Sequence, residues 1–309
     1  MLKMDVVMVG SIAYDSVQSP EGKIEDALGG SAIYGGIASQ FHAKRLNLGS
    51  VGLVGVVGND FLDEDRKSLE DLGLDLRGIE TAEGNTFRWT GSYHGDMGVA
   101  QTHDTQLNVF GEFEPKVPEF ATKPSILFCA NLLPILQSKV LDQVQHTRLS
   151  MLDSMNLWIT TAMDDLLAVM KRVDLIIIND GEVKMIAEDE NFIRASKKVV
   201  EMTGCKTLVV KRGEFGVIAF HGEEIVSLPA YPTEKVIDPT GCGDSFAGTL
   251  ASYFANGEGE LSRNELRDGL IAATVTSSFT LESFGTERLI NLPMEEFEQR
   301  LDSYKRILS

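Results

Sequence analysis

A glycine-rich turn in the last third of the chain limits the folds that this sequence can adopt. The segment Asp238-Pro239-Thr240-Gly241-Cys242-Gly243-Asp244 follows an apolar run that is typical of a β-strand. After it, Phe246, Leu250 and Phe254 recur every four residues, which is the spacing of one face of an α-helix. We therefore predict a strand, a tight turn and a helix in succession, as in α/β proteins.

The glycines of this turn favour an anion site. Gly241 and Gly243 can adopt backbone angles that direct successive N–H groups toward one point. Those amides and the positive end of the helix dipole suit a phosphoryl group during transfer. Asp244, at the helix entrance, can accept a proton from an attacking hydroxyl. A second interpretation is a simple glycine turn whose aspartate caps the helix.

This segment resembles the Asp-Thr-x-Gly-Ala-Gly-Asp signature of the ribokinase-like (PfkB) family of sugar and nucleoside kinases. It departs from the signature in having Pro239-Thr240 after the first aspartate and Cys242 in place of alanine. The resemblance implies that Asp244 is the catalytic base. The three residues before the base then form the anion hole: Gly241, Cys242 and Gly243.

Composition restricts the class of partner. The chain has 309 residues, of which 43% are hydrophobic and 24% charged, as in ordinary globular proteins. Its net charge of −18 and pI of about 4.7 argue against binding to nucleic acid or to an anionic membrane, since both would repel it. No apolar run of about 18 residues predicts a membrane span. The expected partner is a small molecule.

The three cysteines are Cys129, Cys205 and Cys242. Their odd number and irregular spacing disfavour a disulfide framework and a metal site, so a cytoplasmic location is expected. A thiol near a helix N-terminus usually has a lowered pKa, which predicts a reactive Cys242. The simpler alternative is that this cysteine replaces alanine for its similar size.

Strand-like and helical patterns alternate along the chain without repeats or evident linkers. This alternation predicts an α/β fold. The resemblance implies one ribokinase-like kinase domain over residues 1–309, with a three-layer α/β/α architecture and a mostly parallel central sheet. It also implies a small β-sheet lid formed by about residues 12–17 and 86–109. A lid of this kind excludes water during phosphoryl transfer, and it forms a homodimer contact in several family members.

The acceptor side is expected near the amino terminus. Asp15 follows the first predicted strand and resembles the family's sugar-hydroxyl ligand, although a solvated turn aspartate fits as well. Gly29 and Gly30 open a helix of small residues, similar to the family's substrate-binding Gly-Gly segment. Tyr34 stands where ribose-binding members usually have asparagine, and a stacked base would suit it. Asn131 ends another predicted strand, where ligands of open α/β sheets bind.

Asp153, at the end of a further predicted strand, is a candidate of the same kind as Asn131, and either residue can equally be structural. Asn179 and Glu182 match the family's Asn-x-x-Glu motif, which is tied there to magnesium and phosphate. Mg²⁺ keeps several waters, so Glu182 need act only through water. The alternative is a turn with a glutamate at a helix start.

The nucleotide side is expected in two later segments. Lys211, Gly213 and Gly216 are similar to the family's Lys-x-Gly-x-x-Gly element along the nucleotide phosphates, although a solvated basic turn fits Lys211 as well. Gly285 lies where the family closes around adenine.

The sequence thus predicts an ATP- and Mg²⁺-dependent kinase, with a monovalent cation as a further candidate cofactor. Its expected acceptor is a hydroxymethyl group of a sugar or sugar-like molecule. An adenosine or other nucleoside kinase of the same family, or a non-catalytic ligand sensor, remains open as an alternative.

Overall fold

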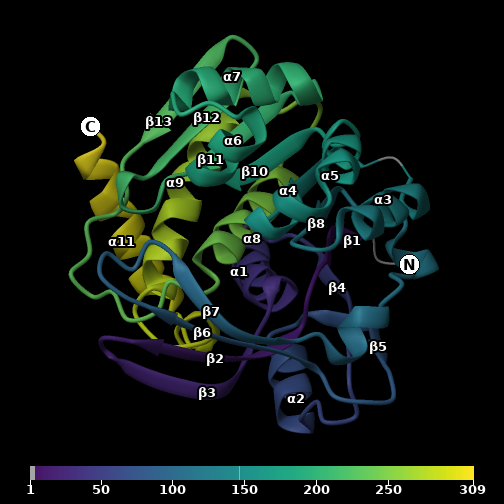
Figure 1. Cartoon of the computed structure of the whole chain (residues 1–309). Helices are drawn as coiled ribbons and strands as arrows, with labels where there is room; N and C mark the ends of the chain where they lie inside the picture. The colour runs from purple at the N-terminus through teal and green to yellow at the C-terminus, as the bar shows by residue number, and fades with distance from the viewer. Residues whose placement is uncertain (1–3, 146) are drawn as a thin grey trace.

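The central feature of the computed structural model is a large sheet with helices on both faces (Figure 1). The structure describes residues 4–145 and 147–309. Over these residues the sheet has nine strands in the order β13-β12-β11-β10-β9-β8-β1-β4-β5. β12 runs antiparallel to both of its neighbours, β11 and β13, and all other neighbouring strands of this sheet are parallel. The strands are β1 (Met4–Val9), β4 (Ser50–Val57), β5 (Asp75–Thr81), β8 (Ile126–Cys129), β9 (Leu149–Asp153), β10 (Leu175–Asn179), β11 (Thr207–Lys211), β12 (Val217–His221) and β13 (Glu224–Leu228).

Side chains from the central strands enter two cores, one on each face of the sheet. In β10, Ile177 packs in the core shared with the helices α1, α8, α9 and α11, whereas Ile176 and Ile178 pack against α4 to α7 on the other face. A strand buried on both faces explains the unbroken apolar runs of the sequence. The predicted three-layer α/β/α fold with a mostly parallel sheet is confirmed.

The helices that form the two outer layers vary in length. They are α1 (Ser31–Arg45), α2 (Asp63–Asp71), α3 (Pro134–Gln143), α4 (Asn156–Thr161), α5 (Met163–Met170), α6 (Asp180–Ala187), α7 (Phe192–Thr203), α8 (Cys242–Ala255), α9 (Arg263–Thr280), α10 (Glu287–Ile290) and α11 (Met294–Ile307). Within the described residues, none of them is long and apolar enough to cross a membrane.

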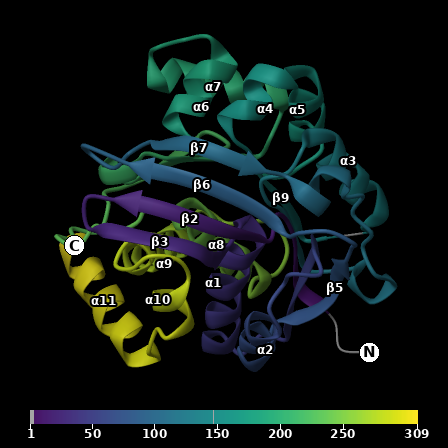
Figure 2. The ribbon, with the colours of Figure 1, turned by 60° about the horizontal axis from the view of Figure 1, so that its bottom comes forward.

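A second, four-stranded sheet lies beside the large one, in the order β3-β2-β6-β7 (Figure 2). We call it the lid sheet. It contains β2 (Ala13–Ser19), β3 (Gly22–Gly29), β6 (Phe87–Tyr93) and β7 (Ala100–Gln106). The segments predicted for the lid supply β2, β6 and β7, and β3 joins them as an antiparallel partner of β2.

The strand predicted immediately before Asp238 is wrong. No strand lies between the end of β13 at Leu228 and the start of α8, both of which fall within the described part of the chain. Prolines at 229, 232 and 239 lack the N–H group that a strand ladder needs. The amide of Ile237 instead donates to the carbonyl of Leu281 over 2.8 Å, which ties this loop to the end of α9.

Helices α1 and α8 approach so closely that their backbones touch. A Cβ atom on Gly248 of α8 would lie 2.0 Å from the carbonyl oxygen of Gly35 in α1. One turn further along, the buried hydroxyls of Ser39 and Ser252 lie 2.8 Å apart. Small residues on both helices therefore permit this contact, which holds the two helix N-termini in a fixed relation.

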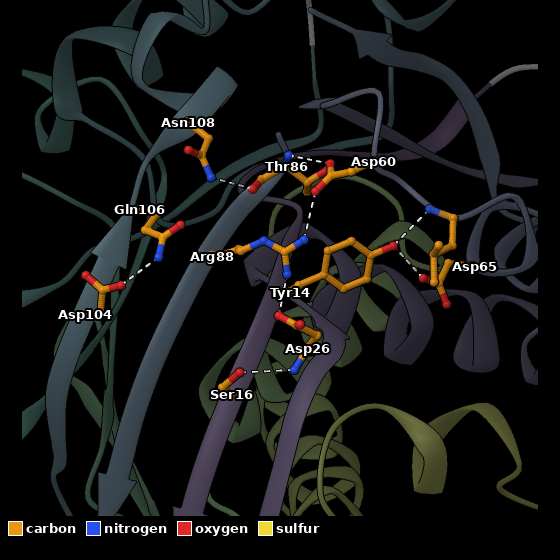
Figure 3. Close-up of polar contacts among 11 residues, drawn as sticks. Tyr14, Ser16, Asp26, Asp60, Asp65, Thr86, Arg88, Asp104, Gln106 and Asn108 are labelled. Carbon is orange, nitrogen blue, oxygen red and sulfur yellow. Dashed lines mark hydrogen bonds and ion pairs between the residues drawn. The ribbon is translucent and has the colours of Figure 1, made fainter. Parts of the chain in front are cut away.

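An arginine joins the lid sheet to the body of the protein (Figure 3). Arg88 of β6 donates to Asp60, after β4, over 2.8 Å, and also to Asp26 of β3. Its guanidinium lies 5.3 Å from the ring centroid of Tyr14, whose hydroxyl donates to Asp65 of α2 over 2.7 Å. Arg88 therefore has one acidic partner in the body of the protein, Asp60, and one in the lid sheet, Asp26. This network fixes the lid sheet to the body.

Replacing Arg88 with methionine should lower the free energy of unfolding by about 1 kcal/mol, because Asp60 loses a partly buried, charged partner. Urea unfolding of the two proteins measures the difference. Lys23→Met is the matched control, since its partner Glu25 and Lys23 itself are largely exposed on β3. The control should leave the midpoint unchanged within error, and equal losses in both variants would contradict a special role of Arg88.

Candidate active site

The N-terminus of α8 forms the predicted glycine cradle. Gly241 is its N-cap, with a left-handed φ of 75°. The amide of Cys242 donates to the carbonyl of Pro239 over 3.1 Å. Gly243 and Asp244 follow in the first turn, where backbone N–H groups have no intrahelical acceptor. Such amides can bind an anion, and the predicted anion hole at this turn stays a prediction.

Neighbouring side chains explain why the cradle needs glycines. A Cβ atom on Gly241 would lie 2.2 Å from the ring of Tyr34. A Cβ atom on Gly243 would lie 2.9 Å from the Nζ atom of Lys211. The loop thus lies between a buried aromatic ring and a charged amine. The ring of Tyr34 excludes a larger residue at Gly241, whereas a larger residue at Gly243 would require the end of the Lys211 side chain to move.

Asp244 has the environment of a general base. Burial raises its pKa from the ordinary value of 3.8 to about 6, and the negative charge of Asp153 raises it further while Lys211 opposes the shift. A base titrating near the working pH combines a useful ionised fraction with a strong pull on the proton.

Of the two interpretations of Cys242, its surroundings favour the simpler one, a residue that replaces alanine for its similar size. Burial raises the pKa of this thiol well above its usual value, and the carboxylates of Asp238 and Asp244 raise it further. The Sγ atom lies 3.7 Å from the carbonyl oxygen of Ser277, to which the thiol donates. Desolvation and two nearby negative charges outweigh the helix dipole, so Cys242 stays protonated and serves as a residue of suitable size.

Asp15, Gly29 and Gly30 come together next to the cradle. The carboxylate of Asp15 accepts the amide of Gly30, and a Cβ atom on Gly29 would lie 2.0 Å from Oδ2 of Asp15. Burial raises the pKa of Asp15 to about 7, and the charges of Asp238 and Asp244 add to the shift. This coupling places the predicted acceptor ligand and the predicted base in one electrostatic site.

Tyr34 is buried with its ring against Gly241, which leaves no free face for a stacked base. Its hydroxyl has no hydrogen-bond partner among the residues that the structure describes. Tyr93 of the lid sheet lies nearby, and Thr240 donates to its hydroxyl over 3.3 Å. The ring of Tyr34 therefore packs against the cradle at Gly241, and Tyr93 connects the cradle to the lid sheet through Thr240.

Asn131 uses its side-chain amide within the protein. Its Oδ1 atom accepts the indole N–H of Trp158 over 2.8 Å, and its Nδ2 lies 3.1 Å from the sulfur of Met155. The geometry therefore favours the structural alternative for this residue, although its contact with a substrate stays a prediction.

Asn179 and Glu182 form a capping box at the start of α6. Glu182 accepts the amide of Asn179 over 2.8 Å, and Asn179 accepts the amide of Glu182 over 2.9 Å. The Glu182 carboxylate is buried, and burial together with Asp153 raises its pKa to about 7. The motif thus starts a helix and also supplies a buried carboxylate, whose raised pKa the nearby charge of Lys211 only partly opposes.

This chemistry fits Mg²⁺ held through water. Buried carboxylates with raised pKa values gain from a nearby hard cation, and Mg²⁺ prefers oxygen ligands and retains waters. Within residues 4–145 and 147–309, no three histidine, cysteine, aspartate or glutamate side chains are grouped closely enough to hold a metal directly. The assignment of Glu182 and Asn179 to a magnesium site stays a prediction.

The residues predicted for the nucleotide separate into two places. Lys211, at the end of β11, pairs with Asp153 over 2.8 Å. Gly213 and Gly216 form the following turn, with left-handed φ values of 52° and 86°. A Cβ atom on Gly213 would meet nothing within 4 Å, so the turn is open at that point.

Gly285 instead lies beside the lid sheet. A Cβ atom there would be 3.2 Å from Ala27 of β3, and its amide donates to Asp238 over 3.3 Å. Asp238 is almost completely buried, and its other oxygen accepts the amide of Thr240 over 2.9 Å. Sequence reasoning gave Asp238 no role of its own, although an aspartate two residues before a free amide is the pattern of an Asx-turn.

The geometry defines an α/β protein with a glycine-rich turn at the N-terminus of α8, and the comparisons give its family. The pfkB family carbohydrate kinase model matches residues 3–291. A cytidine kinase from Thermococcus kodakarensis is 29% identical over 266 residues, which cover 82% of this chain and 90% of that protein.

Two solved structures share the fold. A nucleoside kinase from Methanocaldococcus jannaschii, an archaeal member of the ribokinase family, has a TM-score of 0.76 at 21% identity and covers 98% of this chain and 100% of its own. A putative ribokinase II from E. coli, solved with ATP and Mg²⁺, has a TM-score of 0.77 at 20% identity, with coverages of 97% and 99%.

The fold is therefore that of the ribokinases. The chain belongs to the pfkB family of carbohydrate kinases and is an ATP-dependent phosphotransferase that acts on an alcohol group of a sugar-like small molecule. This confirms the family, the fold and the reaction class predicted from the sequence.

Proposed function

We propose that this enzyme transfers the γ-phosphoryl group of ATP to the hydroxymethyl group of a nucleoside. The observation that carries the proposal is the proximity of Asp15 and Asp244: the carboxylate of Asp15 accepts the amide of Gly30, and the charge of Asp244 is close enough to add to the raised pKa of Asp15. One carboxylate can hold the sugar hydroxyls while the other faces the hydroxyl that reacts.

The chemistry follows from these positions. Asp244 accepts the proton of the acceptor hydroxyl, whose oxygen forms a bond to the γ-phosphorus of ATP. The bond between that phosphorus and the β,γ-bridging oxygen breaks, and ADP leaves with the electron pair. The amides of Gly243 and Asp244, together with the positive end of α8, stabilise the charge of the transferred group. Cys242 belongs to the predicted anion hole through its place in the turn, where its own amide donates to the carbonyl of Pro239, and its thiol takes no part.

The remaining predicted residues surround this step. Lys211, Gly213 and Gly216 lie along the phosphates, and Gly285 closes the site on the side of β3. When bound near Glu182 and Asn179, Mg²⁺ offsets phosphate charge. The lid sheet excludes water through Tyr93, which already contacts Thr240. A monovalent cation beside the anion hole stays a prediction without assigned ligands.

A nucleoside is preferred as acceptor because the cytidine kinase matches this chain along most of both sequences. The kinases of sugar acids that also match, such as 2-dehydro-3-deoxygluconokinase from Escherichia coli, cover only 23% of this chain, although at 45% identity. A free sugar or sugar acid is therefore the second candidate acceptor.

An acceptor screen tests the proposal. The enzyme is given Mg-ATP with cytidine, uridine, adenosine, inosine, ribose, fructose or 2-dehydro-3-deoxygluconate, and ADP formation is measured. We expect a nucleoside to be the best acceptor by kcat/KM, with ³¹P NMR showing a phosphate ester on the oxygen of its hydroxymethyl group. A preference for a free sugar or sugar acid would establish the second candidate, and phosphorylation of a ring hydroxyl would overturn the assigned acceptor group.

Two further expectations belong to this proposal. Homodimerisation through the lid sheet is supported by the exposed edge strand β7, whose residues from Gln101 to Gln106 face solvent. A cytoplasmic location is supported by three cysteines that are all free. Sedimentation analysis of the purified protein measures its oligomeric state and so tests the expected homodimer.

A further inference from the structure

A buried ion pair crosses the carboxyl edge of the large sheet. Lys211 ends β11 and Asp153 ends β9, with β10 between them. In register, Lys211 lies opposite Asn179, and Asp153 opposite Ile177. The lysine side chain reaches over the end of β10 to bring Nζ within 2.8 Å of Oδ2 of Asp153. The exposed fractions of the two side chains are 20% and 5%.

The position of this ammonium is unusual for a structural lysine. It lies against Gly243, where a Cβ atom would be only 2.9 Å from Nζ. A cation beside the positive end of a helix is unfavourable, because the helix dipole repels it. An ammonium has three donors, and among the described residues Nζ donates only to Asp153. An anion between α8 and Lys211 would bind both positive groups at once.

We propose that Lys211 is a further catalytic residue, which contacts the transferred phosphoryl group at Gly243, and that Asp153 is the positioning residue that holds it there. This inference rests on the proposed function, because it concerns the anion hole of that reaction. It places Lys211 at the group in transfer and gives Asp153 a role that no local sequence pattern indicates.

The charges around the pair support this arrangement. Burial lowers the pKa of Lys211, but Asp153 and Glu182 raise it more, so the amine stays protonated. At Asp244, Asp153 raises the pKa and Lys211 lowers it. The two partners therefore act on the pKa of Asp244 in opposite directions, as opposite charges near one carboxylate do, so removing either one should shift that pKa the other way.

Opposite shifts of the pH profile test the proposal. Lys211→Met should lower kcat by about 10²–10³-fold, as removal of one anion-hole donor does, and should move the acid limb of kcat/KM to higher pH. Asp153→Asn should lower kcat by about 10-fold or more, because Lys211 loses its anchor, and should move that limb to lower pH. Lys206→Met, which removes an exposed lysine just before β11, should change neither quantity.

A binding measurement separates this inference from the proposed function. Inorganic phosphate should raise the melting temperature of the wild type and of Lys206→Met, and the rise should be lost in Lys211→Met. Should the wild type phosphorylate no acceptor, the proposed function fails, while this measurement still decides whether Lys211 binds a phosphate group. The same thermal scans show whether each variant folds, and the charge-neutral double variant Asp153→Asn/Lys211→Met replaces either single variant that does not.

Three results would overturn the inference. The first is equal phosphate stabilisation in the wild type and Lys211→Met. The second is a loss of kcat in both single variants with unmoved acid limbs, which would indicate a structural pair. The third is a kcat of Asp153→Asn within twofold of the wild type, which would remove the positioning role.

Discussion

Asp244→Asn should lower kcat by on the order of 10²–10⁴-fold, because asparagine cannot accept the proton of the acceptor hydroxyl. Nucleotide binding should persist, since the amides of the cradle remain. In the wild type, kcat/KM should fall as the pH drops below about 6, where Asp244 becomes protonated. Initial rates from pH 5 to 9 and calorimetric titration with ADP measure both effects.

The same variant should be more stable than the wild type at pH 8. Because burial raises the pKa of Asp244, the folded protein binds this proton more tightly than the unfolded chain does. The wild type therefore loses stability as the pH rises from about 4 to about 6, and it stays less stable above that range. Asparagine avoids this loss, which is on the order of 3 kcal/mol for a carboxylate whose pKa is raised from 3.8 to about 6. The difference in melting temperature should vanish below pH 4.

Asp302→Asn, on the exposed side of α11, is the matched control and should change neither activity nor stability. Activity of Asp244→Asn within tenfold of the wild type would exclude Asp244 as the base. A variant that loses both activity and stability at pH 8 would indicate a structural aspartate instead.

Gly241→Ala should damage both folding and catalysis. The new methyl group would adopt a left-handed φ and would meet the ring of Tyr34 at 2.2 Å. Strain and overpacking each cost about 1–3 kcal/mol, so the free energy of unfolding should fall by at least about 2 kcal/mol. Displacement of the cradle should reduce kcat by on the order of 10²-fold. Urea unfolding and steady-state kinetics measure the two losses.

Gly204→Ala separates the two causes. Gly204 caps α7 with a φ of 68°, close to that of Gly241, but a Cβ atom there would meet nothing within 4 Å. This control should show only the cost of the left-handed backbone, about 1–2 kcal/mol, and full activity. A stability loss in Gly241→Ala no greater than in the control would show that Tyr34 yields to the methyl group.

The fold could be predicted from the sequence because the signals for most of its strands and helices are local. Apolar runs that end in glycine or polar residues predict buried strands, and the small residues after Gly30 predict the first helix. The lid strand β3 gave no such signal, because its outer residues are polar and charged. The strand predicted before Asp238 was wrong for the opposite reason: the segment has an apolar signal, but its apolar residues pack against α9 and the lid sheet without forming a strand ladder.

The local geometry of the candidate site was predictable where one short segment contains its glycines and its aspartate. Gly241 to Asp244 form such a segment, and the structure places them at a helix N-terminus as expected. The pairing of Lys211 with Asp153 was not predictable, because the two residues are 58 positions apart and only the strand order brings them together. The pKa of Cys242 depends on carboxylates that approach from the folded chain, which the helix position alone does not reveal.

The contact between Gly35 and Gly248 has a mechanical consequence. The loop at Gly30 and the cradle at Gly241 each begin one of two helices whose backbones cannot slide past each other without collision. In the proposed reaction, the spacing between an acceptor bound at Gly30 and a phosphoryl group bound at Gly241 is therefore set by this rigid joint between the two helices.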